Sequence, residues 1–359
     1  MKIGIITHYD VHNHGAILQL NGLASFLREL GHEAFALQFD KNYDFLGIGL
    51  KSKYDISFKS IPIYLKYAKE KGLRRTLFNI KKRSLLNAFK SDNNLIGPYY
   101  TETGELDAVI VGSDEVFALH TGPTPVFYGH AAPSKHVISY AGSFGPTTIK
   151  EIDSLHCREF VASGLSRMSS LSVRDINSHD IVKGLIGYEP EVVVDPVILY
   201  GYKKEIESFA RPISKKYMVI YAYDEHMNDL EEISAIKQLA KKMHLKIVSP
   251  GFYHSWADIN VNVSPIGLLQ YVRYADLVVT DTFHGSVTSI ICNTPFASKV
   301  CGNGNKLCNL LSEYNLENRI VSSLDELEMV VNTAIDYEEV NSIIEQRREK
   351  SSQFLKSAL

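Results

Sequence analysis

Residues 281–286 (DTFHGS) place a histidine where a buried strand gives way to a helix. The preceding residues 277–280 (LVVT) are apolar and mostly β-branched, which predicts a short strand buried on both faces. We expect Gly285 to let the backbone turn sharply and Ser286 to present its hydroxyl and amide at the helix start. Ligands of open α/β sheets bind at this end of a strand, beside helix N–H groups. His284 is therefore either a ligand-facing group or a polar residue that only ends a strand.

Three histidines fall within residues 8–16, namely His8, His12 and His14. They lie on an irregular loop, and no cysteine or H-x-x-x-H pattern accompanies them, so a metal site is disfavoured. We expect instead that Asn13, Gly15 and Ala16 let backbone amides at a helix start face a ligand. His14 would then line the same cleft.

A carboxylate follows another apolar strand, in residues 111–117 (VGSDEVF). Ser113 and Asp114 come where that strand ends. A carboxylate in this position can accept hydrogen bonds from sugar hydroxyls or act as a general base. The other interpretation is that Asp114 caps a helix.

An arginine ends a third strand, in residues 172–175 (SVRD). The guanidinium of Arg174 can bind a carboxylate or phosphate through two parallel hydrogen bonds, which would make it an anchor for an anionic ligand. The competing interpretation is a structural salt bridge to Asp175 or Asp195.

The elements that must position these groups alternate between strand and helix in two successive series. The first series has a helix over 16–31 and strand segments at 2–7, 33–39, 107–117, 136–145, 171–175 and 191–199. The second has helices over 228–244 and 264–275 and strand segments at 216–223, 245–251 and 275–280. The two series predict an α/β fold with two Rossmann-like lobes that face a central cleft.

We expect an N-terminal lobe over residues 1–203, a C-terminal lobe over 204–336 and a last helix over 337–359 that packs across both. A basic helical insertion interrupts the first lobe at about 44–100. Within it, residues 51–90 hold twelve Lys or Arg against two acidic residues. This stretch is either a solvated helical excursion or a surface that meets an anionic lipid headgroup or a lipid-linked substrate.

The composition disfavours several classes of protein. With 45% hydrophobic and 22% charged residues among 359, the chain can bury large cores. A net charge of −3 argues against a general nucleic-acid binder. No apolar run approaches the roughly 20 residues that cross a bilayer, and the first residues indicate a strand, not a signal peptide. The four cysteines form no C-x-x-C pair, which favours reduced thiols in a cytosolic protein.

Six motifs, in this order, resemble those of the polysaccharide pyruvyl transferase family over nearly the whole chain. They are N-x-G-A (13–16), G-S-D (112–114), S-Y-A-x-S-F-G (139–145), S-V-R-D (172–175), V-D-P (194–196) and D-T-F-H-G (281–285). The resemblance implies a two-lobed fold of the GT-B class. It also implies transfer of the enolpyruvyl group of phosphoenolpyruvate to hydroxyls of a sugar, which forms a pyruvate ketal. No redox cofactor and no metal are implied.

The resemblance implies roles for individual residues. Ketal formation needs a proton on the methylene carbon of phosphoenolpyruvate, and His284 is the implied general acid. The second lobe would hold the donor, with one arginine reaching over from the first lobe. The donor-binding residues are then Arg174, Thr282, Gly285, Ser286 and Lys306. The acceptor, a sugar or a lipid-linked oligosaccharide of a cell-surface glycan, would meet Asn13, His14, Gly15, Ser113 and Asp114. Such an enzyme would act in the cytoplasm or at the cytoplasmic face of the membrane.

One position departs from the family pattern. Better-characterised members carry arginine two residues before the histidine, where this chain has Thr282. Lys306 or Arg273 would then hold the donor, or the donor is not phosphoenolpyruvate. The alternative function is a GT-B-type glycosyltransferase with a nucleotide sugar, in which Asp114 or His14 is the base and the FHGS helix start receives the diphosphate. A family member that only binds its ligand is the third alternative.

Overall fold

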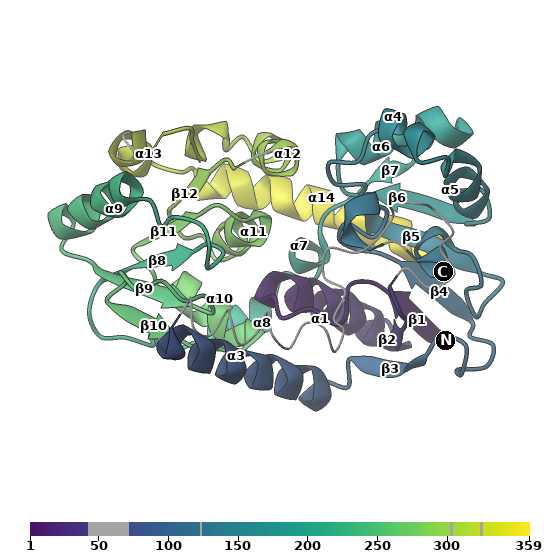
Figure 1. The fold of residues 1–359 in the computed structure, drawn as a ribbon, viewed down its shortest axis with the longest axis horizontal. Coiled ribbons are helices and arrows are strands. Elements are labelled where there is room, and N and C mark those ends of the chain that lie inside the picture. Colours follow the sequence, from purple (N-terminus) through teal and green to yellow (C-terminus); the bar gives the residue numbers. More distant parts are fainter. Residues whose placement is uncertain (42–71, 123, 302–303, 324–325) are drawn as a thin grey trace.

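The computed structural model describes residues 1–41, 72–122, 124–301, 304–323 and 326–359. In these residues the chain forms two α/β lobes, each built on one parallel sheet (Figure 1). The predicted fold class, two Rossmann-like lobes, is confirmed. The part of the predicted basic insertion that precedes residue 72 lies outside the described residues.

The first lobe contains a seven-stranded sheet in the order β3-β2-β1-β4-β5-β6-β7, with parallel pairing throughout. Its strands are β1 (Lys2–Ile6), β2 (Glu33–Gln38), β3 (Ile96–Tyr99), β4 (Ala108–Val111), β5 (Val137–Gly142), β6 (Ser170–Val173) and β7 (Glu191–Val192). The central strands are apolar because helices cover both faces of the sheet, and all four residues of β4 are buried. The strand order reverses between β1 and β4, and ligands of such sheets bind in the crevice at that reversal.

The second lobe repeats this winding in a six-stranded parallel sheet, in the order β10-β9-β8-β11-β12-β13. Its strands are β8 (Tyr217–Tyr221), β9 (Lys246–Pro250), β10 (Ile259–Val261), β11 (Leu277–Thr280), β12 (Phe296–Lys299) and β13 (Ile320–Val321). The order reverses here between β8 and β11. Each lobe therefore offers one ligand crevice at the carboxyl ends of its strands.

Helices surround both sheets. Those of the first half of the chain are α1 (His14–Glu29), α4 (Ile149–Ser154), α5 (Arg158–Leu165), α6 (Ile176–Ile186), α7 (Pro196–Tyr200) and α8 (Lys203–Ser208), with 3-10 turns η2 (Leu119–Thr121) and η3 (Pro125–Tyr128). Those of the second half are α9 (Leu230–Lys242), α10 (Pro265–Arg273), α11 (Phe283–Ile291), α12 (Asn305–Glu313) and α13 (Leu327–Asn332), with the 3-10 turn η4 (Glu317–Arg319). Ser264 caps α10 by accepting a hydrogen bond from Gly267 N.

One apolar core joins the two lobes. Helices α1, α7, α10, α11 and α12 all contribute buried side chains to it, among them Leu23, Ile198, Leu269, Ile290 and Leu311. Two further cores lie separately within the first and the second lobe. The shared interior holds the strand ends of both lobes in a fixed relation around the cleft.

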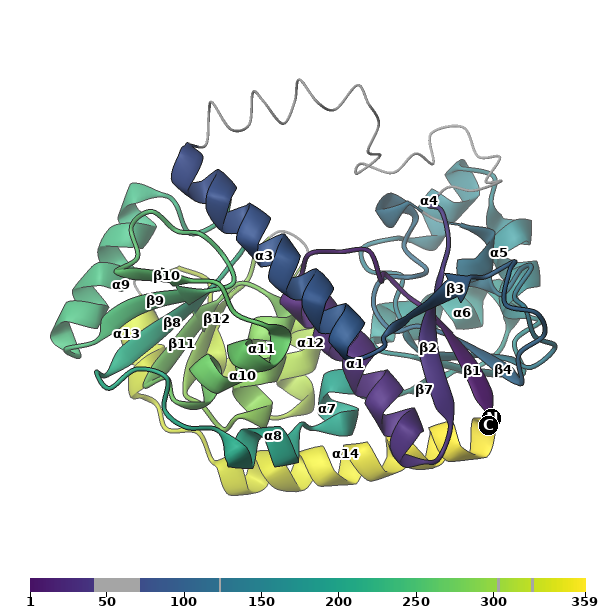
Figure 2. The same ribbon diagram turned by 90° about the horizontal axis from the view of Figure 1, so that it is seen from below.

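Two long helices, α3 (Leu73–Asp92) and α14 (Tyr337–Ala358), run across both lobes (Figure 2). The last turn of α14 meets the first lobe, where His136 Nε2 lies 2.7 Å from Ala358 O. Its middle meets the second lobe, where Arg347 forms an ion pair with Glu313 at 2.8 Å.

Helix α3 bridges the lobes on another side of the molecule. Lys90 Nζ donates a hydrogen bond to Tyr9 O of the first lobe at 3.3 Å. At the other end of the helix, Arg75 forms an ion pair with Asp224 of the second lobe at 3.2 Å.

Three local predictions differ from the structure. The segment 191–199, predicted as a strand, contains only the short β7, and then Asp195 caps α7 through a hydrogen bond from Val197 N. An Asp-Pro pair starts helices, and here it outweighs the β-branched run before it. Helix α1 begins at His14 instead of residue 16 because Asn13 caps it. Strand β3 lies within the predicted insertion, yet it pairs with β2 and belongs to the sheet.

In the described parts of the chain, every helix is too short or too polar to cross a bilayer.

Candidate active site between the two lobes

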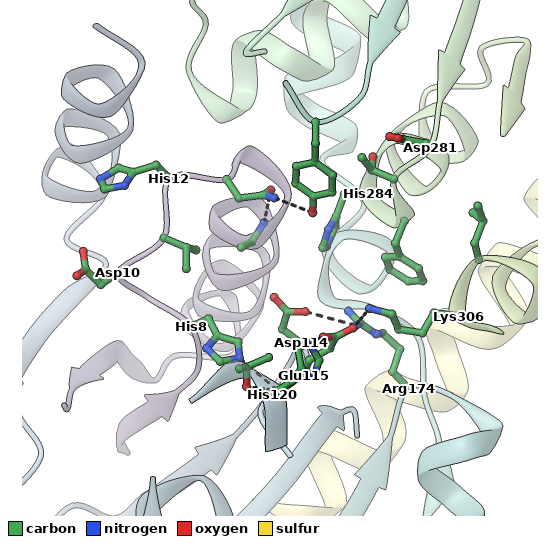
Figure 3. Close-up of a pocket in the computed structure, with 18 of the residues that line it drawn as sticks. His8, Asp10, His12, Asp114, Glu115, His120, Arg174, Asp281, His284 and Lys306 are labelled. Carbon is green, nitrogen blue, oxygen red and sulfur yellow. Dashed lines mark hydrogen bonds and ion pairs between the residues drawn. The ribbon is translucent and has the colours of Figure 1, made fainter. Parts of the chain in front are cut away.

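A cavity of about 940 Å³ opens between the lobes, at the carboxyl ends of strands from both sheets. Its walls come from the segments after β1, β4 and β6 in the first lobe and after β8, β11 and β12 in the second. Both reversals of strand order therefore face one space. Figure 3 shows Asp114 and Arg174 of the first lobe and His284 and Lys306 of the second around it. The predicted site residues that line it are Asn13, Asp114, Arg174, Thr282, His284 and Lys306.

Asn13 ends the loop after β1 and caps α1. Its Oδ1 accepts hydrogen bonds from Gly15 N at 2.8 Å and from Ala16 N at 3.4 Å. The sequence had suggested that these two amides face a ligand. They bind the side chain of the cap residue instead. The amide nitrogen of Asn13 also donates to Tyr223 Oη at 3.4 Å, which joins the two lobes at the cavity wall.

His14 turns away from the cavity, in contrast to the prediction that it lines the cleft. The side chain is fully buried, and its Nε2 lies 3.0 Å from Val263 O of the second lobe. A Cβ on Gly251 would lie 2.4 Å from Cε1 of this ring, so the contact with the second lobe is close. Burial lowers the pKa of His14 to about 3, which keeps the imidazole neutral over most of the pH range.

Helix α11 begins after Thr282, whose Oγ1 accepts a hydrogen bond from Gly285 N at 2.9 Å. Gly285 lies inside the helix instead of at a sharp turn, and a Cβ there would lie 2.0 Å from Thr280 Oγ1. Close packing against β11 therefore leaves no room for a side chain at this position. Ser286 is fully buried, with its hydroxyl 2.7 Å from Ser298 Oγ. It does not present its hydroxyl at the helix start, because at this position of the first turn the side chain points toward the sheet.

His284 lines the cavity from the first turn of α11 and contacts the first lobe. Its Nε2 lies 3.7 Å from Asp195 Oδ2, an ion-pair distance that is too long for a hydrogen bond. A Cβ on Gly15 would lie 2.3 Å from Cγ of the ring, so α1 packs directly against the imidazole. The start of α1 therefore fixes where the imidazole sits.

The position of Arg174 is compatible with both alternatives that the sequence left open. It lines the cavity, and it also forms a structural ion pair, with its Nη1 2.9 Å from Asp195 Oδ2. Its Nη2 lies 3.5 Å from Asp114 Oδ1, and its guanidinium carbon lies 4.5 Å from the centre of the Phe283 ring. Asp175, the other predicted partner, instead caps α6 by accepting a hydrogen bond from Ser178 N.

The charged groups around Arg174 shift one another's pKa values. Burial alone would raise the pKa of Asp114, but Arg174 and the nearby imidazoles hold it well below its usual range. Burial would likewise raise the pKa of Asp195, and His284 and Arg174 together lower it. Both carboxylates are therefore ionised at neutral pH.

An ion pair joins Glu115 of the first lobe to Lys306 of α12 at the cavity. His120 Nε2 lies 3.2 Å from the same carboxylate, and the pKa of Glu115 is lowered although burial acts in the opposite direction. Lys306 thus lines the cavity as predicted, while Arg273 donates to Cys292 O and does not line it.

The strand end at 112–114 presents only one of its two polar side chains to the cavity. Ser113 is buried, and its hydroxyl donates to Gln19 Oε1 at 2.9 Å. Asp114 has a positive φ of 78°, which is uncommon for a residue other than glycine. This left-handed conformation lets Asp114 end the strand and reach the cavity without capping a helix.

The histidines of the loop after β1 are dispersed, as His8 and His12 in Figure 3 illustrate. His8 Nε2 lies 3.2 Å from Glu115 O, whereas His14 contacts the second lobe. Among the described residues, the one group of three side chains with metal-binding atoms close together is elsewhere, and it consists of His226, Asp281 and Cys301.

The sequence did not assign site roles to Asp195, Glu115 or Tyr223. Asp195 appeared only as a competing salt-bridge partner of Arg174, although V-D-P was one of the quoted motifs. Its distances of 2.9 and 3.7 Å to Arg174 and His284 place it between the two. Glu115 follows Asp114 directly, so its position beside the strand end was a signal that could have identified it.

The arrangement provides a proton donor, an anion-binding guanidinium and ionised carboxylates in one cavity. A histidine beside a buried carboxylate can carry a proton to a substrate carbon or oxygen. An arginine and a lysine at the same cavity can neutralise a carboxylate or a phosphate. Such a site suits transfer of an anionic group to a hydroxyl-bearing acceptor.

A family model described as polysaccharide pyruvyl transferase matches residues 13–300. The search of curated proteins gave no significant match.

Among solved structures, a UDP-GlcNAc 2-epimerase from Methanocaldococcus jannaschii, in complex with UDP-GlcNAc and UDP, superposes with a TM-score of 0.51 at 12% identity. The alignment covers 96% of this chain and 99% of that one. A putative UDP-N-acetylglucosamine 2-epimerase from Listeria monocytogenes gives a TM-score of 0.51 at 11% identity, over 94% of this chain and 90% of that one. At such identities the likeness shows the two-lobed fold alone.

Proposed function

The chain belongs to the polysaccharide pyruvyl transferase family, and we propose that it transfers the enolpyruvyl group of phosphoenolpyruvate to hydroxyls of a sugar. The sugar is part of a cell-surface glycan or its precursor, and the product is a pyruvate ketal. The observation that carries this proposal is the meeting of His284, Arg174 and Asp114 in one cavity between the lobes. The first two come from different lobes, so the site exists only in the assembled fold.

In the proposed reaction His284 gives a proton to the methylene carbon of phosphoenolpyruvate. The neighbouring carbon then forms bonds to two sugar oxygens, and its bond to the phosphate oxygen breaks. Two hydroxyl protons are released, of which one restores His284 and the other leaves with phosphate. Asp195 is placed to orient the ring, because its buried carboxylate lies 3.7 Å from Nε2.

Arg174 and Lys306 hold the donor's anionic groups in this proposal. Each is already paired with a carboxylate, Arg174 with Asp195 and Lys306 with Glu115. Binding of a donor would therefore join or replace these ion pairs. Thr282 stands where better-characterised members have arginine, and it contributes its hydroxyl to the helix cap instead of a charge to the donor.

The acceptor lies against the first-lobe wall, where Asp114 is ionised and can accept a hydrogen bond from a sugar hydroxyl. Asn13 lies at the same cavity and can contribute polar contacts. His14, Gly15 and Ser113 were expected in the acceptor site, but they do not line the cavity. Their hydrogen bonds hold the start of α1 and the end of β4 in position.

Thermal unfolding separates the proposed donor from its competitor. Phosphoenolpyruvate should raise the melting temperature, and UDP-N-acetylglucosamine should not. Release of phosphate should then require both phosphoenolpyruvate and a glycan acceptor. A shift with the nucleotide sugar alone would favour the alternative, a GT-B-type glycosyltransferase, and no shift with either ligand would favour a binding-only protein for another ligand.

We propose further that the enzyme acts in the cytoplasm, at the membrane surface that carries lipid-linked acceptors. All four cysteines are free, as suits a reducing compartment. On α3, Leu73, Leu77 and Ile80 have exposed fractions of 76%, 65% and 61%, and they recur at helical spacing on the outer face. The exposed Arg74, Lys81 and Arg83 accompany them, so this face combines apolar and basic groups as membrane-surface helices do.

Vesicle sedimentation tests this contact. The chain should bind vesicles that contain anionic phospholipid and bind less as salt is raised. Leu77→Asp should weaken binding, while Leu230→Asp, at a still more exposed position on α9, should not. Equal binding by both variants would reject α3 as the membrane surface.

A further inference from the structure

We propose that His226, Asp281 and Cys301 form a binding site for one divalent transition-metal ion, Zn²⁺ in particular, at the second-lobe wall of the cavity. All three residues line the cavity. Their ligand atoms, one from each residue, lie within 4.8 Å of one another. The ketal chemistry proposed above does not call for this ion, so the site stands independently of that function.

The three residues follow three strands that are neighbours in the second sheet. His226 comes after β8, Asp281 comes directly after β11, and Cys301 comes two residues after β12. Because the strands are parallel, their carboxyl ends meet at one edge of the sheet. A ligand set on a rigid sheet edge is preorganised, which favours specific binding over chance proximity.

The distances bracket those of a zinc site. His226 Nδ1 lies 2.5 Å from Asp281 Oδ2, and Cys301 Sγ lies 4.0 Å from the same oxygen. Tetrahedral zinc with bonds of about 2.0 Å to N or O and about 2.3 Å to S separates ligand atoms by roughly 3.3–3.5 Å. Binding of an ion would therefore move His226 Nδ1 and Asp281 Oδ2 slightly apart and bring Cys301 Sγ closer to Asp281. These are side-chain adjustments that leave the strands in place.

A second observation points to a ligand. The Asp281 side chain is fully buried, and its Oδ1 has no hydrogen-bond partner among the described residues. A buried carboxylate oxygen without a partner is costly, and coordination of a cation would remove that cost. His226 and Cys301 are exposed by contrast, so an ion could enter from the cavity side.

The ligand types select the metal. Imidazole, carboxylate and thiolate together suit Zn²⁺ and its substitute Co²⁺, whereas Mg²⁺ and Ca²⁺ prefer oxygen ligands alone. Three protein ligands leave a fourth position open to the cavity. A water molecule or an anionic oxygen of a substrate would occupy it, as in catalytic rather than structural zinc sites.

Cobalt spectroscopy on the full chain tests the site. After treatment with a chelator and its removal, Co²⁺ should bind at one equivalent and give the thiolate-to-cobalt absorption band of a tetrahedral site. Zn²⁺ should abolish the band, and Mg²⁺ in excess should not. Cys301→Ser should remove the band and weaken Zn²⁺ binding at least about tenfold by calorimetry.

Two further variants complete the test. Cys308→Ser changes a partly buried cysteine on the neighbouring α12 and should leave both signals unchanged. Asp281→Asn should weaken Zn²⁺ binding as Cys301→Ser does, and its melting curve shows whether it has folded. The proposal is overturned if Co²⁺ gives no thiolate band, which leaves only a hydrogen-bonded His226–Asp281 pair. Equal effects of the two cysteine variants on metal binding would also overturn it.

Discussion

Helices α1 and α11 start at the same kind of place, and each carries a histidine in its first turn, but the two histidines face opposite environments. His14 of the first lobe points into the interior and contacts Gly251 and Val263 of the second lobe. His284 of the second lobe lines the cavity and contacts Gly15 of the first. Each lobe thus places one imidazole against a glycine of the other.

The difference arises from position within the first turn. His14 follows the cap Asn13 directly, whereas one residue, Phe283, separates His284 from the cap Thr282. A step of one residue rotates a helical side chain by about 100°. A histidine at a helix start is therefore a structural contact or a reactive group according to a shift of one position.

The same substitution at the two histidines should give opposite results. We expect His284→Gln to lower turnover about 10²-fold or more, because glutamine retains hydrogen bonding but cannot deliver a proton. The melting temperature should change little, since the side chain lies at the cavity wall. Phosphate release with phosphoenolpyruvate and an acceptor measures the effect, and near-normal turnover would remove His284 from the mechanism.

His14→Gln should instead change the response of stability to acid. Burial lowers the pKa of His14 from 6.5 to about 3, so the unfolded chain takes up a proton that the folded chain refuses. Stability from this source is complete above pH 6.5 and is lost as the pH falls toward 3. Urea unfolding at pH 7 and pH 4.5 measures the change. Between these two pH values, the free energy of unfolding should fall by about 2 kcal/mol less in the variant than in the wild type.

Glutamine keeps a donor that can reach Val263 O, which isolates the charge effect from the hydrogen bond. His284→Gln makes the same substitution at the cavity wall and serves as the comparison. An identical acid response in wild type and His14→Gln would contradict the buried, neutral state of His14.

The sequence predicts well what is decided locally. The strand that ends at Thr280, the helix start after it and the two-lobed winding follow from apolar runs, caps and turn residues. Asp114 and Arg174 were likewise placed correctly at strand ends that face the cavity. These features depend on a few neighbouring residues or on the order of elements.

What the sequence could not give is the direction of side chains that depend on the other lobe. His14 and Ser286 were expected at the cleft, yet one is buried against the second lobe and the other bonds Ser298. Asp195 lies beside Arg174 and His284 because it caps α7, which packs against α1 of the first lobe and α11 of the second. No local pattern specifies such contacts between lobes.

The glycines that receive the two histidines should also differ when changed. Gly251 has a φ of +81°, and a Cβ there would lie 2.4 Å from the His14 ring. We expect Gly251→Ala to lower the free energy of unfolding by about 1–2 kcal/mol from the left-handed backbone alone, with a further loss from the buried contact. Thermal or urea unfolding measures the change, and turnover at low temperature should be nearly unaffected.

Gly187→Ala supplies the matched control, because Gly187 also has a positive φ, of +69°, but nothing within 4 Å of its Cβ position. The excess loss at Gly251 over Gly187 reports the contact with His14. Equal losses would mean that His14 yields easily and does not join the lobes tightly.

Gly15→Ala should have the smallest effect on stability, and its main effect should be on chemistry. The new methyl group would lie 2.3 Å from Cγ and 2.4 Å from Cβ of His284, so the imidazole and the contact between α1 and α11 must shift. Alanine is a better helix former than glycine, by up to about 1 kcal/mol, which offsets part of the resulting loss of stability. Turnover should fall by up to about tenfold while the affinity for phosphoenolpyruvate, measured by calorimetry, stays the same.

Gly267→Ala on α10, where the nearest atom would be 3.2 Å away, should leave turnover unchanged. If Gly15→Ala retained full turnover, the contact between α1 and His284 would not set the position of the proposed acid. The packing of each histidine against a glycine of the other lobe would then matter for stability alone.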